Sequence, residues 1–219
     1  MRLSERLYAA AAPIWQKTLT HPFITGLGDG SLPLDNFRFY MCQDYVFLIE
    51  YSRLLALATA KAGDLTTMGR FANLLDATLN QEMALHREFA AQCGISPAVL
   101  AETIVAPTTY AYTCHLIRVA ALADLPEIVA ALLPCQWGYC EIGQMLASRG
   151  KPINVPFYGQ WIDMYASPEF ATLAAWLRDL LDTYDSAVDE KRLVDTFCTS
   201  ARYEYLFWEM AYRMERWSV

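Results

Sequence analysis

Apolar side chains recur every three or four positions through almost the whole chain, and this spacing is typical of amphipathic helices. The stretch from Leu3 to Leu19 is one example, and the stretch from Pro33 to Lys61 is a longer one. Strands would appear as short runs of alternating apolar and polar residues bounded by turn residues, and no such run stands out. The pattern therefore predicts an all-α fold.

Helix start and stop residues divide this pattern into segments. Capping residues are expected at Ser31, Asp64, Asp124 and Ser167, and Gly94 and Gly150 are expected to end helices. We predict helices over about 3–19, 33–61, 64–94, 108–122, 124–150, 156–165, 167–184 and 189–217, with a short helical turn after residue 96. Kinks are expected at Pro13 and Pro134, and residues 26–30, rich in glycine, are interpreted as a turn.

The chain of 219 residues suits one domain, residues 1–219, because it shows no repeat, low-complexity tract or long linker. Hydrophobic residues make up 55% and charged residues only 19% of the sequence. This apolar balance is typical of proteins that bury further surface by self-association.

Charge and cysteine usage exclude several classes of partner. The net charge is −7 and no Lys/Arg cluster occurs, so neither a nucleic acid nor a membrane surface is expected as a partner. Six cysteines occur without a Cys-x-x-Cys pair, which indicates reduced thiols in the cytoplasm. Neither a signal peptide nor an apolar stretch long enough for a transmembrane helix is recognised.

A metal site is not predicted. Di-metal helical bundles use several carboxylates with Glu-x-x-His pairs, and this chain has three histidines and no such pair. Glu82 and His86 lie four residues apart, and we interpret them as a pair on a helix surface.

A cysteine directly after a proline in an apolar helix is a candidate nucleophile. Pro134 cannot donate to the carbonyl four residues earlier, so unpaired backbone is expected beside Cys135, with Tyr139 one turn further on. The alternative is a buried free cysteine beside a tolerated proline, which is the common case for an isolated cysteine.

Four helix faces place single polar groups among aromatic rings. A carboxylate or thiol is costly to bury without a partner, whereas aromatic walls around one suit a flat heteroaromatic ligand. Each face alone also fits core packing. The faces are Asp44/Phe47/Tyr51, Thr108/Tyr112/His115, Cys135/Tyr139 and Glu204/Phe207/Trp208.

The chain resembles the TenA family, the bacterial thiaminase II or aminopyrimidine aminohydrolase, in segments spread in order over nearly its whole length. These segments are His21-Pro22-Phe23, Gln43-Asp44-Tyr45, Pro107-Thr108-Thr109-Tyr110-Ala111-Tyr112, Leu132-Leu133-Pro134-Cys135, Trp161-Ile162-Asp163-Met164-Tyr165-Ala166-Ser167 and Tyr203-Glu204-Tyr205-Leu206-Phe207-Trp208. The Leu-Pro-Cys segment is similar to the cysteine-bearing branch of the family.

This resemblance implies a fold of the haem-oxygenase type, a homotetramer, and no metal or organic cofactor. It implies Cys135 as the nucleophile and Glu204 as the acid/base. The residues implied to hold an aminopyrimidine are Asp44, Tyr112, Tyr139 and Tyr165, with Phe207 in the wall of the pocket. Position 47 is commonly Tyr in this family, where its hydroxyl assists the cysteine; here it is Phe47, and Tyr51 one turn on is the substitute.

The implied reaction replaces the amine, or the thiazolium of thiamin, on the exocyclic methylene of a 4-amino-2-methylpyrimidine with water. As a hypothesis, Glu204 protonates the ring, the Cys135 thiolate adds to a ring carbon, and the ring electrons expel the leaving group. Water then adds to the methylene and the thiol departs, which gives the hydroxymethylpyrimidine. The hypothesis requires a site that favours the thiolate, and a Glu204 whose pKa is raised by desolvation.

Three alternatives remain at this stage. A metal-dependent or haem-dependent oxidase could use the same scaffold, although the histidines are few. A non-enzymatic regulatory protein would need a basic face or an apolar groove. A related enzyme could act on a different amine, because Phe47 departs from the family pattern.

Overall fold

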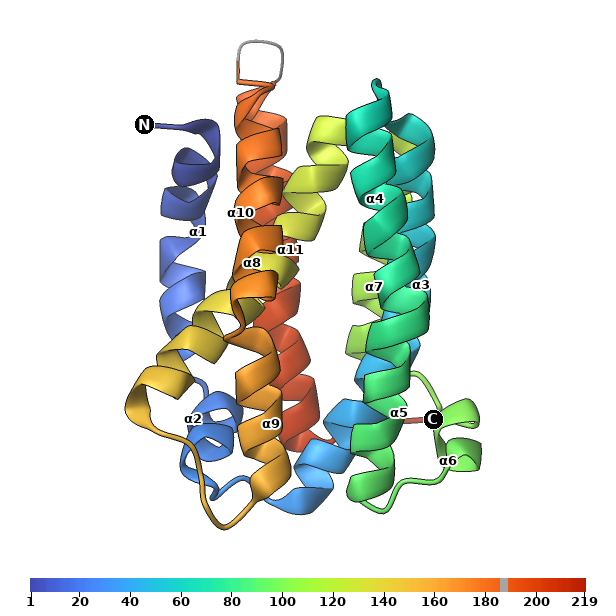
Figure 1. Ribbon diagram of the computed structural model, residues 1–219, viewed down its shortest axis with the longest axis vertical. Coiled ribbons are helices and arrows are strands. Elements are labelled where there is room, and N and C mark those ends of the chain that lie inside the picture. Colours follow the sequence, from blue (N-terminus) through green and yellow to red (C-terminus); the bar gives the residue numbers. More distant parts are fainter. Residues whose placement is uncertain (186–188) are drawn as a thin grey trace.

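The computed structural model describes residues 1–185 and 189–219, and its regular elements in these ranges are all helical (Figure 1). The elements are α1 Leu3–Leu19, α2 Pro22–Asp29, α3 Leu34–Lys61, α4 Leu65–Ala77, the π-helical turn η1 Thr78–Glu82, α5 Met83–Gln92, α6 Pro97–Ala101, α7 Pro107–Leu122, α8 Leu125–Arg149, α9 Pro156–Tyr165, α10 Pro168–Asp182 and α11 Glu190–Arg213. The predicted all-α class is confirmed.

Several predicted helix starts are confirmed by their caps. The Asp64 side chain accepts a hydrogen bond from the Thr67 amide, and the Ser167 hydroxyl accepts one from Phe170. Ser31 is not the cap of α3, because the capping position falls on Pro33 and carries no side-chain hydrogen bond. The ends of helices were predicted less accurately than their existence, as hydrogen-bonded termini depend on local geometry.

Three segments differ from the prediction. Residues 26–29 are not a turn but part of α2, whose first turn begins at Pro22 and whose end is capped by Gly30 at φ 79°. The helix predicted over 64–94 is divided by η1, a π-helical turn in which the backbone takes one more residue per hydrogen-bonded ring. The last helix ends at Arg213 rather than 217, where Met214 adopts a left-handed conformation.

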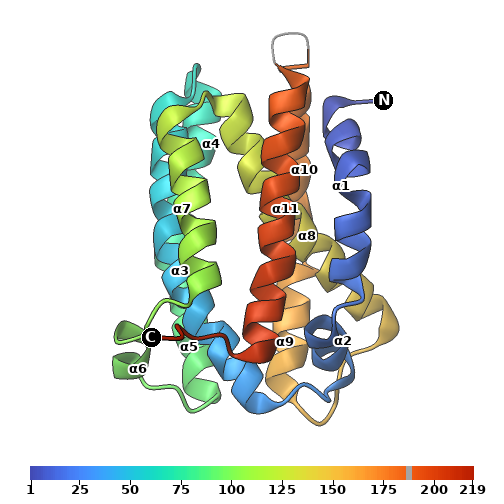
Figure 2. The same ribbon diagram turned by 180° about the vertical axis from the view of Figure 1, so that it is seen from behind.

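The long helices form two groups that run the length of the molecule. In both views α3, α4 and α7 stand together on one side and α1, α10 and α11 on the other, while α8 crosses between them (Figures 1 and 2). Helix α8 contacts α11, α10, α9 and α7, and therefore brings its side chains to the centre of the bundle.

A glycine allows α9 to pack closely on α8. A Cβ atom at Gly143 would lie 2.5 Å from the backbone carbon of Tyr165, which is closer than any side chain allows. The contact places the end of α9 against the middle of α8. As a result the rings of Tyr139 and Tyr165 are 4.7 Å apart between their centroids.

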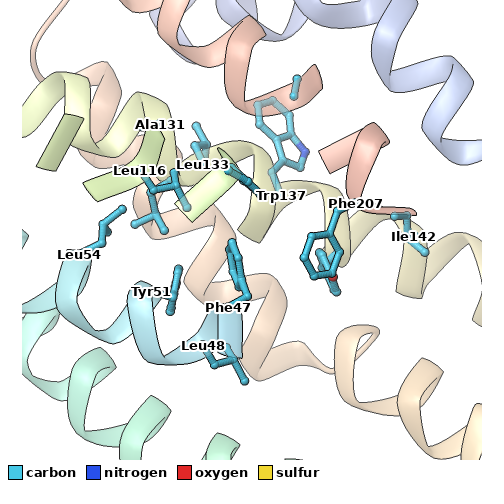
Figure 3. Close-up of a cluster of buried hydrophobic side chains, with 14 of the residues drawn as sticks. Phe47, Leu48, Tyr51, Leu54, Leu116, Ala131, Leu133, Trp137, Ile142 and Phe207 are labelled. Atoms are coloured by element: carbon cyan, nitrogen blue, oxygen red, sulfur yellow. The ribbon is translucent and has the colours of Figure 1, made fainter. Parts of the chain in front are cut away.

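The core at the centre of the bundle is rich in aromatic rings. Figure 3 shows Phe47, Tyr51 and Phe207 in this cluster, with aliphatic side chains such as Leu54 and Leu116 beside them. The first three side chains are at most 4% exposed. Buried aromatic rings supply large apolar contact areas and rigid walls, so any polar group in this region is surrounded by stiff surfaces.

Candidate active site

Three helices bring a thiol, a carboxyl and a phenol together in this core. The Tyr112 hydroxyl of α7 donates a hydrogen bond of 2.5 Å to Glu204 Oε1 of α11. The Cys135 thiol of α8 lies near the Glu204 carboxyl, whose negative charge contributes to raising the pKa of the thiol. We call Cys135, Glu204 and Tyr112 the thiol cluster. Glu204 is its centre, because both other groups interact with it.

Burial sets the protonation of this cluster. Loss of water around Glu204 raises the pKa of its carboxyl to about 7, although the hydrogen bond from Tyr112 opposes part of the rise. Desolvation also raises the pKa of the Cys135 thiol well above its ordinary value, and the negative charges of Glu204 and Asp44 raise it further. The raised pKa predicted for Glu204 is confirmed. The expectation that the resting site favours the thiolate is wrong, because a buried thiol among carboxylates keeps its proton.

A second group of ionisable side chains lies on α3 and on the segment that follows α4. Asp44 is 5% exposed and accepts a hydrogen bond of 3.4 Å from the Tyr40 hydroxyl. His86 Nε2 lies 3.1 Å from Asp44 Oδ2, and because a carboxylate only accepts, the ring donates to it. We call Asp44, His86 and Glu82 the carboxylate cluster.

Glu82 belongs to this cluster because η1 turns it inward. It lines a small cavity together with Asp44, His86 and Tyr165. Desolvation, with a smaller contribution from the charge of Asp44, raises the pKa of Glu82 to about 7. The interpretation of Glu82 and His86 as a surface pair is therefore wrong: His86 is only 6% exposed, and its partner is Asp44.

Aromatic rings enclose the space between these groups. The Tyr139 hydroxyl lies 3.3 Å from that of Tyr40, and Trp161 donates to the Tyr40 oxygen at 3.2 Å. Phe47 packs against Tyr112 at 5.2 Å and against Phe207 at 5.7 Å between ring centroids. We call Tyr40, Phe47, Tyr139, Tyr165 and Phe207 the aromatic cage. Its flat walls suit a planar ring.

Tyr51 is linked to the residue that follows the cysteine. Gln136 Nε2 donates a hydrogen bond of 2.6 Å to the Tyr51 hydroxyl. The Gln136 Oε1 atom is buried and has no hydrogen-bond partner among the described residues. Phe47 has no hydroxyl to offer the thiol, so Tyr51 is the phenol of α3 that is connected to this part of α8.

The structure brings the nine predicted site residues into the same central region. They come from α3, α7, α8, α9 and α11, and they are Asp44, Phe47, Tyr51, Tyr112, Cys135, Tyr139, Tyr165, Glu204 and Phe207. Sequence reasoning missed Tyr40, Glu82, His86 and Gln136 as members of the site. The i, i+4 spacing of Glu82 and His86 was the available signal, but it did not show which face of the helix is buried.

The described residues show neither a metal-binding cluster nor a membrane-spanning helix. The described residues contain no group of three or more His, Cys, Asp or Glu side chains suited to hold a metal ion. Within the same ranges, no helix combines the length and the apolar character that crossing a bilayer requires.

Comparison with known proteins identifies the family. The model of the TENA/THI-4/PQQC family matches residues 8–214. The chain belongs to this family. An aminopyrimidine aminohydrolase from Halalkalibacterium halodurans is 46% identical over 221 residues, an alignment that covers 100% of this chain and 99% of that protein.

Solved structures agree with this assignment. A TenA homologue from P. horikoshii OT3 superposes with a TM-score of 0.92 at 29% identity, over 97% of this chain and 99% of the other. A domain with a haem oxygenase-like fold from Shewanella denitrificans OS217 gives a TM-score of 0.74 at 14% identity, over 96% and 92% of the two chains. The predicted TenA family and haem-oxygenase-like fold are both confirmed.

Proposed function

We propose that this TenA-family chain is an aminopyrimidine aminohydrolase of thiamin metabolism. It replaces the amine, or the thiazolium of thiamin, on the exocyclic methylene of a 4-amino-2-methylpyrimidine with water. The observation that carries the proposal is the Glu204 carboxyl inside the aromatic cage, which accepts a hydrogen bond from Tyr112 and lies beside the Cys135 thiol. Full-length relatives that bear this enzyme name support it.

Each cluster has a role toward the ring. Asp44 accepts a hydrogen bond from the 4-amino group, because a carboxylate offers only acceptors to an amine donor. His86 holds Asp44 in place from the other side. The aromatic cage holds the flat ring, with Phe47 and Phe207 in its wall and Tyr139 and Tyr165 at its edge.

The thiol cluster moves one proton and forms one bond. The Glu204 carboxylate takes the thiol proton from Cys135 and delivers it to a ring nitrogen. The thiolate sulfur then adds to a ring carbon that the protonation has made electrophilic. Because the proton moves from sulfur to the ring, no free thiolate has to exist in the resting site. This route agrees with the raised pKa of both groups.

Departure and hydration complete the reaction. The ring electrons, with the nitrogen proton still in place, expel the leaving group from the methylene carbon, and because its nitrogen takes the electrons of the broken bond, an ammonium departs as ammonia and a thiazolium as the neutral thiazole. Water adds to that carbon and gives up a proton. The sulfur then leaves the ring carbon with its bonding electrons and takes back the ring-nitrogen proton through Glu204, which restores the thiol and releases 4-amino-5-hydroxymethyl-2-methylpyrimidine.

The finer assignments belong to the same proposal. We take residues 1–219 as one domain, because α1 and α11 at its two ends pack together.

A homotetramer is supported by exposed apolar side chains such as Leu65, Ile104 and Leu122, each at least 75% exposed. A cytoplasmic location is supported by six free cysteines, and the charge of −7 argues against a nucleic-acid partner. Sedimentation velocity tests the tetramer.

The test of the reaction is the release of hydroxymethylpyrimidine from 4-amino-5-aminomethyl-2-methylpyrimidine. We expect turnover by the wild type and a loss on the order of 10⁴-fold or more in kcat for Cys135→Ala, the scale on which loss of a covalent nucleophile acts. The matched control is Cys114→Ala, which removes an exposed thiol from α7. Retention of most of the turnover by Cys135→Ser or Cys135→Ala would contradict the covalent route.

A further inference from the structure

A groove leads from the surface to the carboxylate cluster and is not used by the ring in the route above. It is lined by side chains of α4, η1, α5, α8, α9 and α10, and it encloses about 740 Å³ of space, part of it open to solvent. Its walls include Leu74, Leu85, Met164 and Phe170, and two of its polar members are Glu82 and Gln136. The groove thus combines apolar walls with two acids, Glu82 and the exposed Glu169, and two amides, Gln81 and Gln136.

Glu82 joins this groove to the interior. It lines both the groove and the small inner cavity in which Asp44 and Tyr165 lie. The π-helical turn η1 ends at this residue, and such turns are frequent at functional sites because they redirect side chains from the helical register. A group attached to a ring held at Asp44 can thus reach Glu82, while the same group can depart along the groove.

The groove and the inner cavity are each lined by a residue with a buried atom that has no hydrogen-bond partner among the residues the structure describes, Gln136 in the groove and His86 in the cavity. Gln136 is 6% exposed, and its Oε1 atom has no hydrogen-bond partner in the described part of the chain. His86, equally buried, has an unpaired Nδ1, and its Nε2 already donates to Asp44, so in the neutral ring Nδ1 is an acceptor. A carboxylate, an amide oxygen and a ring nitrogen are all acceptors, and a primary ammonium supplies three donors and one positive charge.

We propose that Glu82 is the specificity-determining residue that pairs with the cationic group on the exocyclic methylene of the substrate, with Gln136 Oε1 as a second acceptor. This inference rests on the proposed function and extends it from the ring to the group that the ring loses. Before departure, Glu82 pairs with the ammonium, or with the positive charge of the thiazolium. The C–N bond breaks with its electrons going to nitrogen, and the groove conducts the neutral ammonia, or the larger neutral thiazole, away from the site.

Charge explains why Glu82 is needed. Moving an ammonium from water into the aromatic cage costs free energy unless a group of opposite charge accompanies it there. Asp44 already pairs with His86 and is assigned to the 4-amino group in the proposed function, so the carboxylate placed to pair with the ammonium is Glu82, which lines both the inner cavity and the groove. Truncating one partner of a buried, hydrogen-bonded charge pair generally costs a factor of roughly 30 or more in affinity.

The experiment compares two ligands that differ only in this group. One is 4-amino-5-aminomethyl-2-methylpyrimidine, which carries the ammonium; the other is the hydroxymethyl product, which is neutral there. For each variant we would measure kcat/KM for the amine and the inhibition constant of the product. For Glu82→Gln we expect kcat/KM for the amine to fall by about 30-fold or more, with the product's inhibition constant changed less than about threefold.

Controls separate the outcomes. Glu88→Gln changes an exposed glutamate of α5, and both readouts should keep their wild-type values. Glu82→Ala should lose the preference for the amine as Glu82→Gln does, so it replaces that variant if the first fails to fold. Equal losses for amine and product in a folded variant, or no loss for the amine, would overturn the role of Glu82. A wild type that neither converts nor binds either compound would instead overturn the proposed function itself.

Discussion

The thiol cluster and the carboxylate cluster contain the same type of group in different surroundings. Glu204 and Glu82 are both glutamates whose pKa desolvation raises to about 7. Glu204 accepts a hydrogen bond from a phenol and lies beside a thiol, whereas Glu82 lies beside another carboxylate and lines an open groove. In the proposed reaction the neighbouring groups decide the role of each glutamate. Glu204, beside a phenol and a thiol, transfers a proton, and Glu82, beside a second carboxylate, pairs with a cation.

The sharpest way to break this comparison is Glu204→Gln. An amide can still accept the Tyr112 hydrogen bond, but it cannot take the thiol proton, so kcat should fall on the order of 10³-fold, within the range for loss of a general acid/base. The measurement is steady-state release of hydroxymethylpyrimidine. Affinity for that product should change little, and a large loss of product binding would show that Glu204 mainly shapes the pocket.

Asp44→Asn tests the carboxylate cluster at the ring. The amide keeps the shape of the carboxylate, but one of its two ends is now an N–H donor. That N–H opposes a donor of either the 4-amino group or the His86 ring, so one hydrogen bond is lost. We expect kcat/KM to fall by about 100-fold, mainly through KM, because a buried group left without its partner costs roughly 1–3 kcal/mol. A fall confined to kcat would mean that Asp44 acts in chemistry rather than in holding the ring.

Stability measured against pH compares the two glutamates directly. Each has a folded-state pKa raised from 4.5 to about 7, so the folded chain holds protons that the unfolded chain releases. The stabilisation is complete below pH 4.5 and is lost as the pH rises toward about 7, by at most about 3 kcal/mol for each group. Urea unfolding between pH 5 and 8 should therefore show a smaller decline in Glu204→Gln, and likewise in Glu82→Gln.

The pH profile of the unfolding free energy contains other contributions. Burial lowers the pKa of His21 and His115, and these groups favour the folded chain as the pH rises through that range. The difference between wild type and each variant isolates the glutamate. An unchanged slope in both variants would contradict the raised pKa of the two carboxyls.

The smallest expected effect is that of Phe47→Tyr, at the boundary between the clusters. The ring of residue 47 packs against Tyr112 and Tyr51, so an added hydroxyl would lie among the groups around the thiol. A hydroxyl that donates to the sulfur favours the thiolate. We expect the alkylation of Cys135 by iodoacetamide to accelerate about threefold to tenfold, which corresponds to roughly 0.6–1.4 kcal/mol. Slower alkylation would indicate that the hydroxyl only crowds the cage.

The fold was largely predictable because helical spacing and caps are local signals. Asp64 and Ser167 begin helices through hydrogen bonds to residues three positions away. Helix α2 escaped prediction because its glycines resemble a turn, while Gly26 packs closely against the backbone of Leu32 and Gly28 against the end of the Leu146 side chain. That packing involves residues distant in the sequence or beyond the helix, so periodicity alone could not reveal it.

The site was predictable where a residue's face was unambiguous. Phe47, Tyr51 and Asp44 share one face of α3, and the structure places that face inward. Glu82 and His86 were misread because regular α-helical geometry was assumed through residues 78–82, where the chain forms a π-helical turn. Protonation was misjudged for Cys135 because its pKa depends first on desolvation in the folded core and then on carboxylates from other helices.

The π-helical turn η1 has a consequence for how this site responds to changes in chain length. Successive residues in an α-helix are about 100° apart around the axis, and a π-helical turn accommodates one residue more than the regular path. Because the π-helical turn takes up its extra residue locally, α5 keeps the orientation toward α3 that it would have without that residue. Deleting a single residue between Thr78 and Gln81 would therefore let α4 and α5 join as one regular helix without a rotation of that size, and an alignment gap there would signal the loss of the π-helical turn beside Glu82 rather than a reoriented α5.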